Sequence, residues 1–516
     1  MNEVDVVVVG AGPVGLYLAI DLAMRGVSVQ LLDKARRPLR HSRASVLWPR
    51  QLELMQAIGV VDDLMDRGRA IEGVEFHSNR HDLGQLRFSA IREAPYPFGL
   101  AISQEMTERM LVKRYEGDFG PLARSSEVVG LSQDASGVDL TVVTVGRTEN
   151  VRAKWVIGAD GAHSAVRELA GITFTGPPGT ARFGIGDAAI EGTLSTRMLH
   201  YIYSRSTAIG ISPFTEKTMR IAVAMSPDAE KPDHAFFRKI LTQNSRLVTD
   251  VHAPEWTSAF DVAFRTAERF RAGRVLLAGD AAHLLSPAGG QGMNTGLQDA
   301  ANLGWKLAHV IQKIADERLL DTYDDERRAA AARVASTSAR LARWSGVSGP
   351  RATKMRDAAV FVATRSLRRP NLVDTITQLD TRYDLDNEAS GSKLIGSRFP
   401  SFAGKAPSRA PWSSWPTHDR DRHTLFLWPG RTLAHNWAVQ VAAIEPRTAH
   451  CVRDLGAIAA PGSALRLGRR PHYYLVRPDG HIIAEGVLGR DGAIPPHVLN
   501  AQQATSRALF ENKKGD

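Results

Sequence analysis

A β-branched run that ends in closely spaced glycines lies near the start of the chain and constrains its fold more than any other feature. Val4–Val9 leads into Gly10-Ala11-Gly12-Pro13-Val14-Gly15. A β-branched run of this kind, interrupted only by Asp5, is typical of a strand covered on both faces of a parallel sheet. The glycines then have distinct expected roles, with a tight turn at Gly10, room for a pyrophosphate at Gly12 and close helix packing at Gly15.

The residues that follow complete a strand–helix–strand unit. Apolar residues from Leu16 to Ala23 share one helical face, Gly26 ends the helix, and Val29–Leu32 predicts a second strand that delivers Asp33, followed by Lys34. An acidic residue about 20 positions beyond the glycines is placed to bind the ribose of an adenosine, while the helix N-terminus favours the pyrophosphate. The pattern therefore indicates an adenine dinucleotide. A purely structural βαβ unit is the alternative, and it leaves Asp33 without a role.

Two further motifs bear on which dinucleotide is bound. The first is a strand that enters an Asp-Gly turn and then a helix, Trp155-Val-Ile-Gly-Ala-Asp160-Gly161 through Arg167. The second runs from Arg274 to Gly279-Asp280-Ala-Ala-His283 and continues as Pro287-Ala-Gly-Gly290-Gln-Gly292-Met293-Asn294, with a helix expected from about Thr295. These two motifs together are more specific than the first glycines alone.

A flavin would give the second motif a physical purpose. A strand ending at Gly279 lets Asp280 reach ribityl hydroxyls, and the glycine-rich loop lets backbone lie along an isoalloxazine ring. The next helix would direct its N-terminus at the pyrimidine end of that ring, where negative charge gathers on reduction. The alternative is a buried Asp280 that caps the helix, with glycines that only form a turn.

With these motifs, Arg43 and Gln104, the chain resembles the group A FAD-dependent aromatic hydroxylases typified by para-hydroxybenzoate hydroxylase. It looks closest to three-domain members that oxidise phenols and aromatic polyketides. The resemblance implies FAD as cofactor and NADPH or NADH as a co-substrate that docks transiently, near Arg43, Asp160 and His283. It also implies flavin-site roles for Gly10, Gly12, Pro13, Val14, Gly15, Asp33, Lys34, Arg43, Gln104, Asp160, Gly161, Gly279, Asp280, Pro287, Gly290, Gly292, Met293 and Asn294, with Pro287, Gly290 and Gly292 positioning the ring.

The expected fold is α/β, with a Rossmann-like FAD-binding domain, an inserted antiparallel β-sheet substrate domain and a C-terminal thioredoxin-like domain. We expect the FAD domain to comprise 1–72, 97–175 and 266–385, and the substrate domain 73–96 and 176–265. A linker over 386–415, rich in Gly, Ser and Pro, would precede the thioredoxin-like domain at 416–516. Within that last domain, 437–443 and 472–476 are predicted strands.

The expected substrate sheet shows alternating patterns at 198–203, 208–211 and 219–224. Tyr201 and Tyr203 share one face of the first strand and His200 takes the other, so they cannot all line one pocket. We favour the tyrosine face, and Trp48, Phe98 and Phe214 are further aromatic candidates for substrate contact. His200 is more simply explained as a structural residue.

The sequence identifies neither a catalytic base nor a metal site. His77 and His81 have HxxxH spacing, but they lack the Glu that follows the first His in a zinc-protease helix. In the implied reaction the cofactor carries the chemistry, which explains why no triad, metal or paired carboxylate stands out. NAD(P)H reduces FAD, O₂ is captured as a flavin C4a-hydroperoxide, and one oxygen passes to a phenolic or polycyclic aromatic substrate. Baeyer–Villiger or antibiotic-inactivating oxidation on the same scaffold is the alternative, followed by a non-oxygenating FAD-binding protein.

Composition sets the remaining expectations. The net charge of +10 is compatible with nucleic acid, membrane or anionic small molecules, and the dinucleotide motifs favour the last, with no nucleic acid and no membrane partner. The single Cys451 excludes an internal disulfide and dithiol exchange in the tail. We therefore expect a cytoplasmic enzyme, either a monomer or a homodimer, with a structural C-terminal domain.

Overall fold

The computed structural model describes most of the chain. The described residues are 4–38, 44–78, 81–91, 94–176, 180–204, 207–226, 228–286, 289–345, 347, 349–366, 369–385, 392, 394–400, 418–430, 437–455, 470–489 and 493–500. None of the described helices combines the length and the hydropathy that crossing a bilayer requires.

The first layer is a sheet built around β1 (Val4–Val9), with strand order β21-β22-β11-β1-β2-β8. β1 pairs in parallel with β2 (Val29–Asp33) and with β11 (Arg147–Gly158), and β11 pairs in parallel with β22 (Val275–Leu277). The apolar run of β1 is buried as predicted. The sheet is completed by β8 (Ala123–Arg124), β21 (Arg271–Ala272) and two antiparallel strands beyond β11, β9 (Ser126–Gln133) and β10 (Val138–Thr144).

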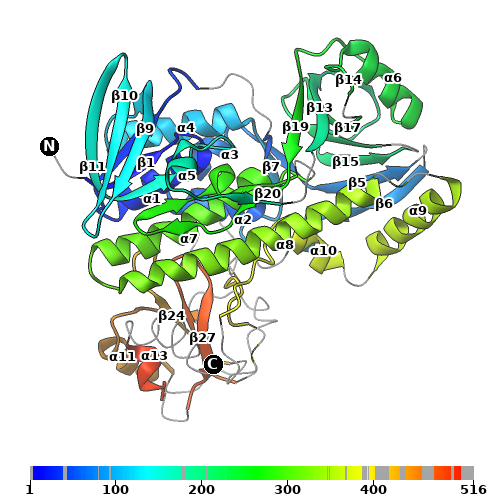
Figure 1. The fold of residues 1–516 in the computed structure, drawn as a ribbon. Helices are drawn as coiled ribbons and strands as arrows, with labels where there is room; N and C mark the ends of the chain where they lie inside the picture. Colours follow the sequence, from blue (N-terminus) through cyan, green and yellow to red (C-terminus); the bar gives the residue numbers. More distant parts are fainter. Residues whose placement is uncertain are drawn as a thin grey trace.

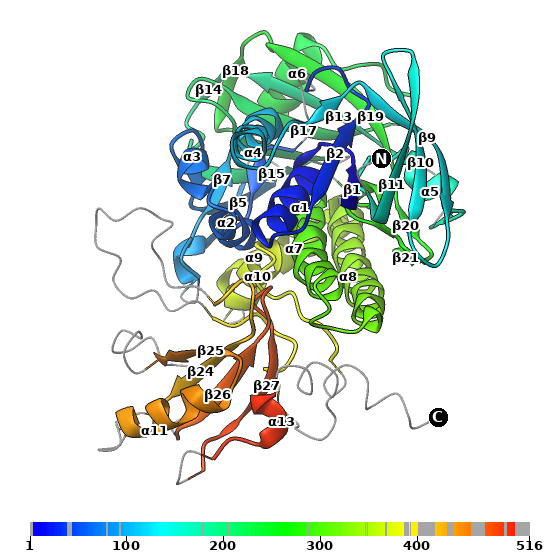
Figure 2. The same cartoon turned by 90° about the vertical axis from the view of Figure 1, so that its left-hand side faces the viewer.

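A layer of long helices, α1 (Pro13–Met24), α4 (Gln104–Asp118) and α7 (Gly292–Ile311), packs on or near this sheet. α1 lies against α4 and α7, and its core residues join those of the sheet in one hydrophobic cluster. α1 is apolar on nearly all sides because it lies between the sheet and α7. The N-termini of α1 and α7 thereby come close to the same edge of the sheet (Figure 2).

The second layer is a seven-stranded sheet among the described residues, ordered β19-β13-β17-β16-β15-β5-β6. Its strands are β5 (Gly73–Ser78), β6 (His81–Arg87), β13 (Thr180–Ala188), β15 (Met198–Tyr203), β16 (Ala208–Pro213), β17 (Met219–Met225) and β19 (Trp256–Ala263). The strands predicted from alternation are confirmed. The parallel pairing of β15 with β5 joins residues 73–87 to the strands from 180–263 in one sheet, and α6 (His234–Asn244) packs beside it (Figure 1).

The long helix α8 (Asp321–Ser345) runs beneath both sheets in Figure 1. α9 (Pro350–Arg365) and α10 (Arg369–Ile376) follow, and α9 begins at a proline. Short elements complete the upper part of the molecule, namely β3 (Val46–Leu47), α2 (Pro49–Ala57), α3 (Val61–Met65), β4 (Arg69–Ile71), η1 (Phe88–Ala90), β7 (Gly99–Ala101), α5 (Ala165–Leu169), β12 (Phe174–Thr175), β14 (Ile190–Gly192), β18 (Val248–Val251), β20 (Arg265–Ala267), η2 (Gly279–Ala281), β23 (His283–Leu284) and η3 (Glu317–Leu320).

The C-terminal unit is a separate mixed sheet below α7 and α8 (Figure 2). β24 (Thr424–Trp428) pairs in parallel with β25 (Cys451–Asp454) and antiparallel with β26 (His472–Val476), which pairs with β27 (Ile482–Val487). The unit also contains α11 (Trp437–Ile444), η5 (Glu445–Arg447) and α13 (Pro496–Leu499). The strand predicted at 472–476 is confirmed. That expected at 437–443 is wrong, because Trp437 and Ile444 face inward one heptad apart and Val439 faces solvent, which is a helical arrangement.

A buried cluster of charged side chains, Lys306, Glu326, Arg477 and Asp479, attaches this unit to the helices above it. The Arg477 guanidinium donates to both Glu326 oxygens at 2.7 and 2.9 Å, and Lys306 Nζ lies 3.0 Å from Glu326 Oε2. The four side chains are between 0% and 5% exposed. α7, α8 and the C-terminal sheet are thus joined through charges that have no access to water. The thioredoxin-like assignment of the unit stays a prediction.

Candidate active site

The turn after β1 contains three glycines, two of which have no room for a side chain and one of which has open space beside it. Gly10 has φ of +105°, and a Cβ there would lie 2.4 Å from the Ala159 carbonyl oxygen. A Cβ on Gly15 would lie 1.9 Å from the Gly10 carbonyl oxygen. Gly12 differs, because a Cβ there would meet no protein atom within 4 Å although the residue is half-buried. The turn therefore leaves open space, called the hollow below, beside Gly12 at the start of α1.

Asp33 is fixed at the rim of this turn. Its Oδ2 accepts a hydrogen bond from the Ala11 N–H at 2.7 Å, and its Oδ1 accepts one from the Ala35 N–H at 2.6 Å. The next side chain, Lys34, is exposed. Gln104, at the first turn of α4, donates from Nε2 to Glu108 Oε1 at 2.8 Å. Burial raises the pKa of Glu108, and the nearby charge of Asp33 adds to that shift.

The Asp-Gly turn holds α5 in place. Ser164 Oγ donates to Asp160 Oδ1 at 2.5 Å, and the Val166 N–H donates to Asp160 Oδ2 at 3.2 Å. Burial nevertheless raises the pKa of Asp160. Gly161 has φ of +83° and, like Gly12, leaves open space where a Cβ would stand. The structure thus gives Asp160 a capping role, and its contact with a flavin stays a prediction.

The second Gly-Asp motif begins next to α1. Gly279 has φ of +63° and packs closely against Val14. A Cβ added to Gly279 would lie 3.1 Å from Val14 Cγ2. The Gly279 N–H donates to Asp299 Oδ2 at 3.0 Å, so a buried carboxylate on α7 fixes the turn. Asp280 projects at the exposed side of this turn. The arrangement leaves the Asp280 side chain on the same edge of the sheet as Gly12.

His283 does not lie where the resemblance implied. Its side chain is fully buried, and Nε2 lies 2.6 Å from Asp299 Oδ2, while Arg327 Nε donates to Asp299 Oδ1 at 2.7 Å. Burial opposes ionisation of Asp299, but His283 and Arg327 together lower its pKa. A side chain held inside the core in this way is not available to a nicotinamide that docks at the surface. The expected role for His283 is therefore corrected to a structural one.

The loop before α7 is tied to the segment 46–48 by one amide. Asn294 is fully buried, and its Nδ2 donates to the carbonyl oxygens of Val46 at 2.9 Å and Gly290 at 2.6 Å. Its Oδ1 accepts from the Trp48 N–H at 3.1 Å, and Trp48 Nε1 donates to the Gly289 carbonyl at 3.2 Å. The side chain of Asn294 therefore positions the loop. Gly292 and Met293 are half-buried beside it, and a Cβ on Gly292 would meet no protein atom.

A cavity of about 620 Å³ opens between this loop and the seven-stranded sheet. Its walls are β13, β15, β16 and β17, the segment 44–46, and Gly289 and Gly290. Small side chains line much of it, since β16 and β17 contribute Ala208, Gly210, Ala222 and Ala224. The cavity is thus broad, largely apolar and directly adjacent to the glycine loop.

Arg220 is the one charged side chain among the described residues that line this cavity. Its Nε and Nη2 each donate to an oxygen of Asp187 at 2.8 Å, and both side chains are buried. Its guanidinium also stacks on Phe214 with the Cζ atom 4.1 Å from the ring centre. Sequence reasoning missed Arg220, although the alternation at 219–224 placed it on one face with two alanines.

The aromatic candidates divide among three locations. Tyr201 lines the large cavity, while Trp48 and Tyr203 line with it a neighbouring cavity of about 260 Å³. Burial raises the pKa of Tyr201 to about 12, and its hydroxyl is hydrogen-bonded to the backbone of Gly289. Phe214 lines neither cavity and stacks on the Arg220 guanidinium. Phe98 packs edge-on against Tyr96 beside the core of the first layer and lines neither cavity, so its predicted substrate contact is not supported.

Two predicted site residues, Arg43 and Pro287, lie outside the described residues. The rest of the flavin set, from Gly10 to Asn294, comes together along one edge of the first sheet and the N-termini of α1 and α7. The hollows at Gly12, Gly161 and Gly292 are what an extended ligand with a pyrophosphate and a flat ring would fill. The donor set and the open glycine positions therefore fit FAD.

Comparisons with known proteins agree with this geometry. A family model described as the FAD binding domain matches residues 3–338. The chain is 33% identical over 489 residues to a rifampicin monooxygenase from Streptomyces venezuelae, covering 93% of this chain and 95% of that protein. The structure of an anhydrotetracycline hydroxylase from Streptomyces rimosus matches with a TM-score of 0.74 and 30% identity over 99% of both chains. A flavin-dependent monooxygenase solved with FAD and substrate shares the fold, with a TM-score of 0.76, 23% identity and 99% of both chains covered.

Proposed function

The chain belongs to the FAD-binding-domain family of flavin-dependent monooxygenases, and from that premise we propose that it hydroxylates a phenolic or polycyclic aromatic compound with NAD(P)H and O₂. The observation that most supports this proposal is the position of the 620 Å³ cavity. Gly289 and Gly290 belong both to its wall and to the loop expected to hold the flavin ring. A ligand in this cavity would face that ring. Its volume lies inside the range of about 300–1,000 Å³ usual for small-molecule sites.

The bound cofactor supplies the oxygen chemistry, in which FAD reduced by NAD(P)H activates O₂ and delivers one oxygen atom to the substrate. The protein's task is to bind, orient and exclude water. The apolar walls suit a flat ring system, and the small side chains of β16 and β17 leave room for several fused rings. Tyr201, whose pKa is raised to about 12 by burial, offers a neutral hydroxyl at the boundary between cavity and loop.

We assign Arg220 the task of favouring a phenolate over a phenol. A free phenol ionises at about pH 10, and an opposite charge within about 4–6 Å favours the ionised form. A phenolate is a more electron-rich acceptor for the oxygen atom. Asp187 offsets part of the Arg220 charge, so the effect on a bound phenol is smaller than that of an unpaired arginine.

A substrate panel tests the proposal. Phenols and polycyclic aromatics are scored by NAD(P)H oxidation together with product mass, with ¹⁸O₂ as the oxidant. Hydroxylation incorporates one labelled atom and leaves the carbon skeleton intact. Cofactor oxidation that yields only peroxide across the whole panel would contradict the proposed substrate class.

Oxidative modification of an antibiotic, including Baeyer–Villiger insertion, is the second candidate. It is favoured by the similarity over 93% of the chain to a protein named rifampicin monooxygenase, and by a cavity wide enough for a drug-sized ligand. Both reactions add one oxygen atom, so mass alone does not separate them. The product's NMR spectrum does, because ring insertion converts a ketone to an ester whereas hydroxylation adds a hydroxyl to an intact ring.

A further inference from the structure

The face of the seven-stranded sheet that points away from the substrate cavity carries a cluster of one carboxylate and two imidazoles. Glu75 and His77 are two residues apart on β5 and so share a face. His200 lies on the neighbouring strand β15, directly opposite Glu75 in the parallel register. On the other face, Phe76 stacks on Tyr201 with ring centres 5.8 Å apart, and Tyr201 lines the cavity.

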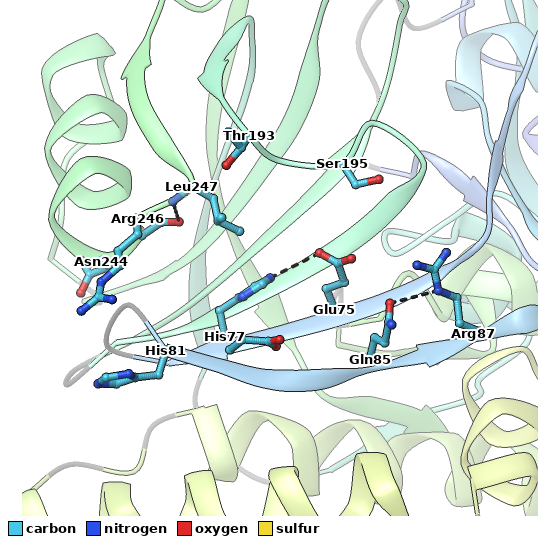
Figure 3. A pocket seen from close by; sticks show the side chains of 12 residues that line it. Glu75, His77, His81, Gln85, Arg87, Thr193, Ser195, Asn244, Arg246 and Leu247 are labelled. Carbon is cyan, nitrogen blue, oxygen red and sulfur yellow. Dashed lines mark hydrogen bonds and ion pairs between the residues drawn. The ribbon is translucent and has the colours of Figure 1, made fainter.

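The potential ligand atoms of this cluster converge. His200 Nδ1 lies 3.3 Å and His77 Nε2 lies 3.6 Å from the same oxygen, Oε2 of Glu75. One ligand atom from each residue lies within 4.8 Å of the other two. Figure 3 shows the His77 ring directed at Glu75, while the His81 ring at the start of β6 lies apart from both.

The hydrogen bond of His200 indicates which of its ring nitrogens carries a proton and which is free to bind a ligand. His200 Nε2 lies 2.9 Å from the Ser195 carbonyl oxygen, which only accepts hydrogen bonds, so Nε2 carries the proton. The remaining nitrogen, Nδ1, is then a bare lone pair in a neutral ring. It faces a carboxylate oxygen, and its side chain is 0% exposed. Neither His200 Nδ1 nor His77 Nε2 makes a hydrogen bond.

Lone pairs that face an anion repel it unless a cation stands between them. A proton could serve between His77 and Glu75, because a neutral His77 ring can carry it on Nε2, but at His200 a proton on Nδ1 would create an imidazolium ion in a fully buried side chain. A single divalent cation satisfies all three groups at once. The two measured separations also fit, since ligands at about 2.0–2.1 Å from a tetrahedral zinc ion stand roughly 3.3–3.4 Å apart.

We propose that Glu75, His77 and His200 bind Zn²⁺ or another first-row divalent cation, with the fourth coordination position open to solvent. Nitrogen and carboxylate ligands are those that zinc takes in three-ligand sites. The bond from His200 Nε2 to the Ser195 carbonyl is the outer contact by which proteins fix the tautomer and orientation of a ligating histidine.

An entry path is present. A cavity of about 470 Å³ reaches the cluster and is lined by Glu75, His77, Thr193, Ser195 and Arg246, among others (Figure 3). It is open to solvent on the side away from the flavin loop and holds room for a water at the fourth position. The ion would join β5 to β15, two strands about 125 positions apart in sequence, beneath the wall that carries Tyr201.

The test uses the full-length protein loaded with FAD, stripped of metal with a chelator and then titrated with Zn²⁺ or Co²⁺. We expect one equivalent to bind, a melting temperature that rises with Zn²⁺ concentration, and the intense visible bands of a tetrahedral Co²⁺ site. Glu75→Gln and His77→Gln should weaken Zn²⁺ binding by at least about 100-fold, the upper end of what loss of an outer-shell partner alone causes.

His81→Gln is the matched control, because His81 lines the same cavity and is exposed but lies outside the cluster. It should bind Zn²⁺ as the unaltered protein does. Absence of saturable Zn²⁺ binding at micromolar metal, or a Co²⁺ spectrum without tetrahedral bands, overturns the proposal in the unaltered protein, whether or not the variants fold. Equal loss of binding in His81→Gln overturns it as well. FAD content is measured throughout, so these results are independent of the enzyme's substrate.

Discussion

Replacing Gly12 by alanine should separate cofactor binding from folding, because the new methyl group would enter the hollow and touch nothing in the protein. Gly12 has φ of −73° and ψ of 178°, an extended conformation that alanine adopts freely. Gly15 lies three residues later in the same turn, yet a Cβ there would lie 1.9 Å from the Gly10 carbonyl oxygen. The pair therefore provides a variant and a matched control that differ only in what the methyl group meets.

The magnitudes follow from these contacts. Gly12→Ala should change the unfolding free energy of the FAD-free protein by less than about 1 kcal/mol, toward greater stability. A pyrophosphate displaced by the methyl group would lose one or two hydrogen bonds from backbone N–H groups, each worth about 1.5–3 kcal/mol to a charged partner. A loss of about 3 kcal/mol weakens FAD binding by about a hundredfold. Gly15→Ala forces backbone to move and should cost about 3 kcal/mol of stability.

Two measurements check this prediction. Urea unfolding of the FAD-free proteins gives the stability of each variant, and quenching of flavin fluorescence gives the dissociation constant of FAD. We expect Gly12→Ala to unfold like the parent and to bind FAD weakly, and Gly15→Ala to unfold early. Unchanged FAD affinity in Gly12→Ala, or a loss of stability equal to that of Gly15→Ala, would refute the assignment of the hollow to the pyrophosphate.

Three further predictions concern the cavity, the buried cluster and the response to acid. Arg220→Gln should lower kcat/KM for a phenol at least tenfold and move the pH profile of coupled turnover to higher pH, because the positive charge that favours a phenolate is lost. Arg220→Lys retains the charge and should leave the pH profile where it is. A pH profile that does not move in Arg220→Gln excludes phenolate stabilisation. Arg477→Met leaves Glu326 buried without its main partner and should cost about 3–5 kcal/mol in urea unfolding, while Arg109→Met at a surface pair leaves the transition unchanged. Burial lowers the pKa of His418 to about 4, so between pH 6.5 and 4 the unfolded chain binds more protons and stability falls as pH falls. Melting temperatures over that interval should drop, with a shallower slope in His418→Gln; a flat profile contradicts the burial of a neutral ring.

Local patterns were enough to predict much of the fold. The apolar run at 4–9 coincides with β1, and the alternating run at 198–203 coincides with β15. These strands were predictable because the spacing of apolar residues along a strand reflects which of its two faces are covered. The apolar run at 437–443 was wrongly expected as a strand. A short, largely apolar run of this kind fits either structure by periodicity, and only packing against the C-terminal sheet decides it.

The candidate site was predictable where backbone geometry dictates the residue. Gly10 and Gly15 are needed for steric reasons that the motif itself expresses. Arg220 and the Glu75–His77–His200 cluster were not found, because they depend on which strand lies beside which. The pairing of β5 with β15 joins residues 125 positions apart, and no periodicity within either strand reports it. His283 was misplaced for the same reason, since its burial depends on α7 and α8.

The buried ion-pair cluster limits how this protein can exchange parts with its relatives. A chimera that takes its C-terminal unit from a homologue would bring Lys306 and Glu326 against whatever side chains the donor supplies in place of Arg477 and Asp479. An uncompensated charge at that depth costs several kcal/mol, comparable with much of a domain's net stability. Functional recombinants should therefore inherit α7, α8 and the C-terminal sheet as one block, with the crossover placed before Gly292 and not in the segment that joins the units.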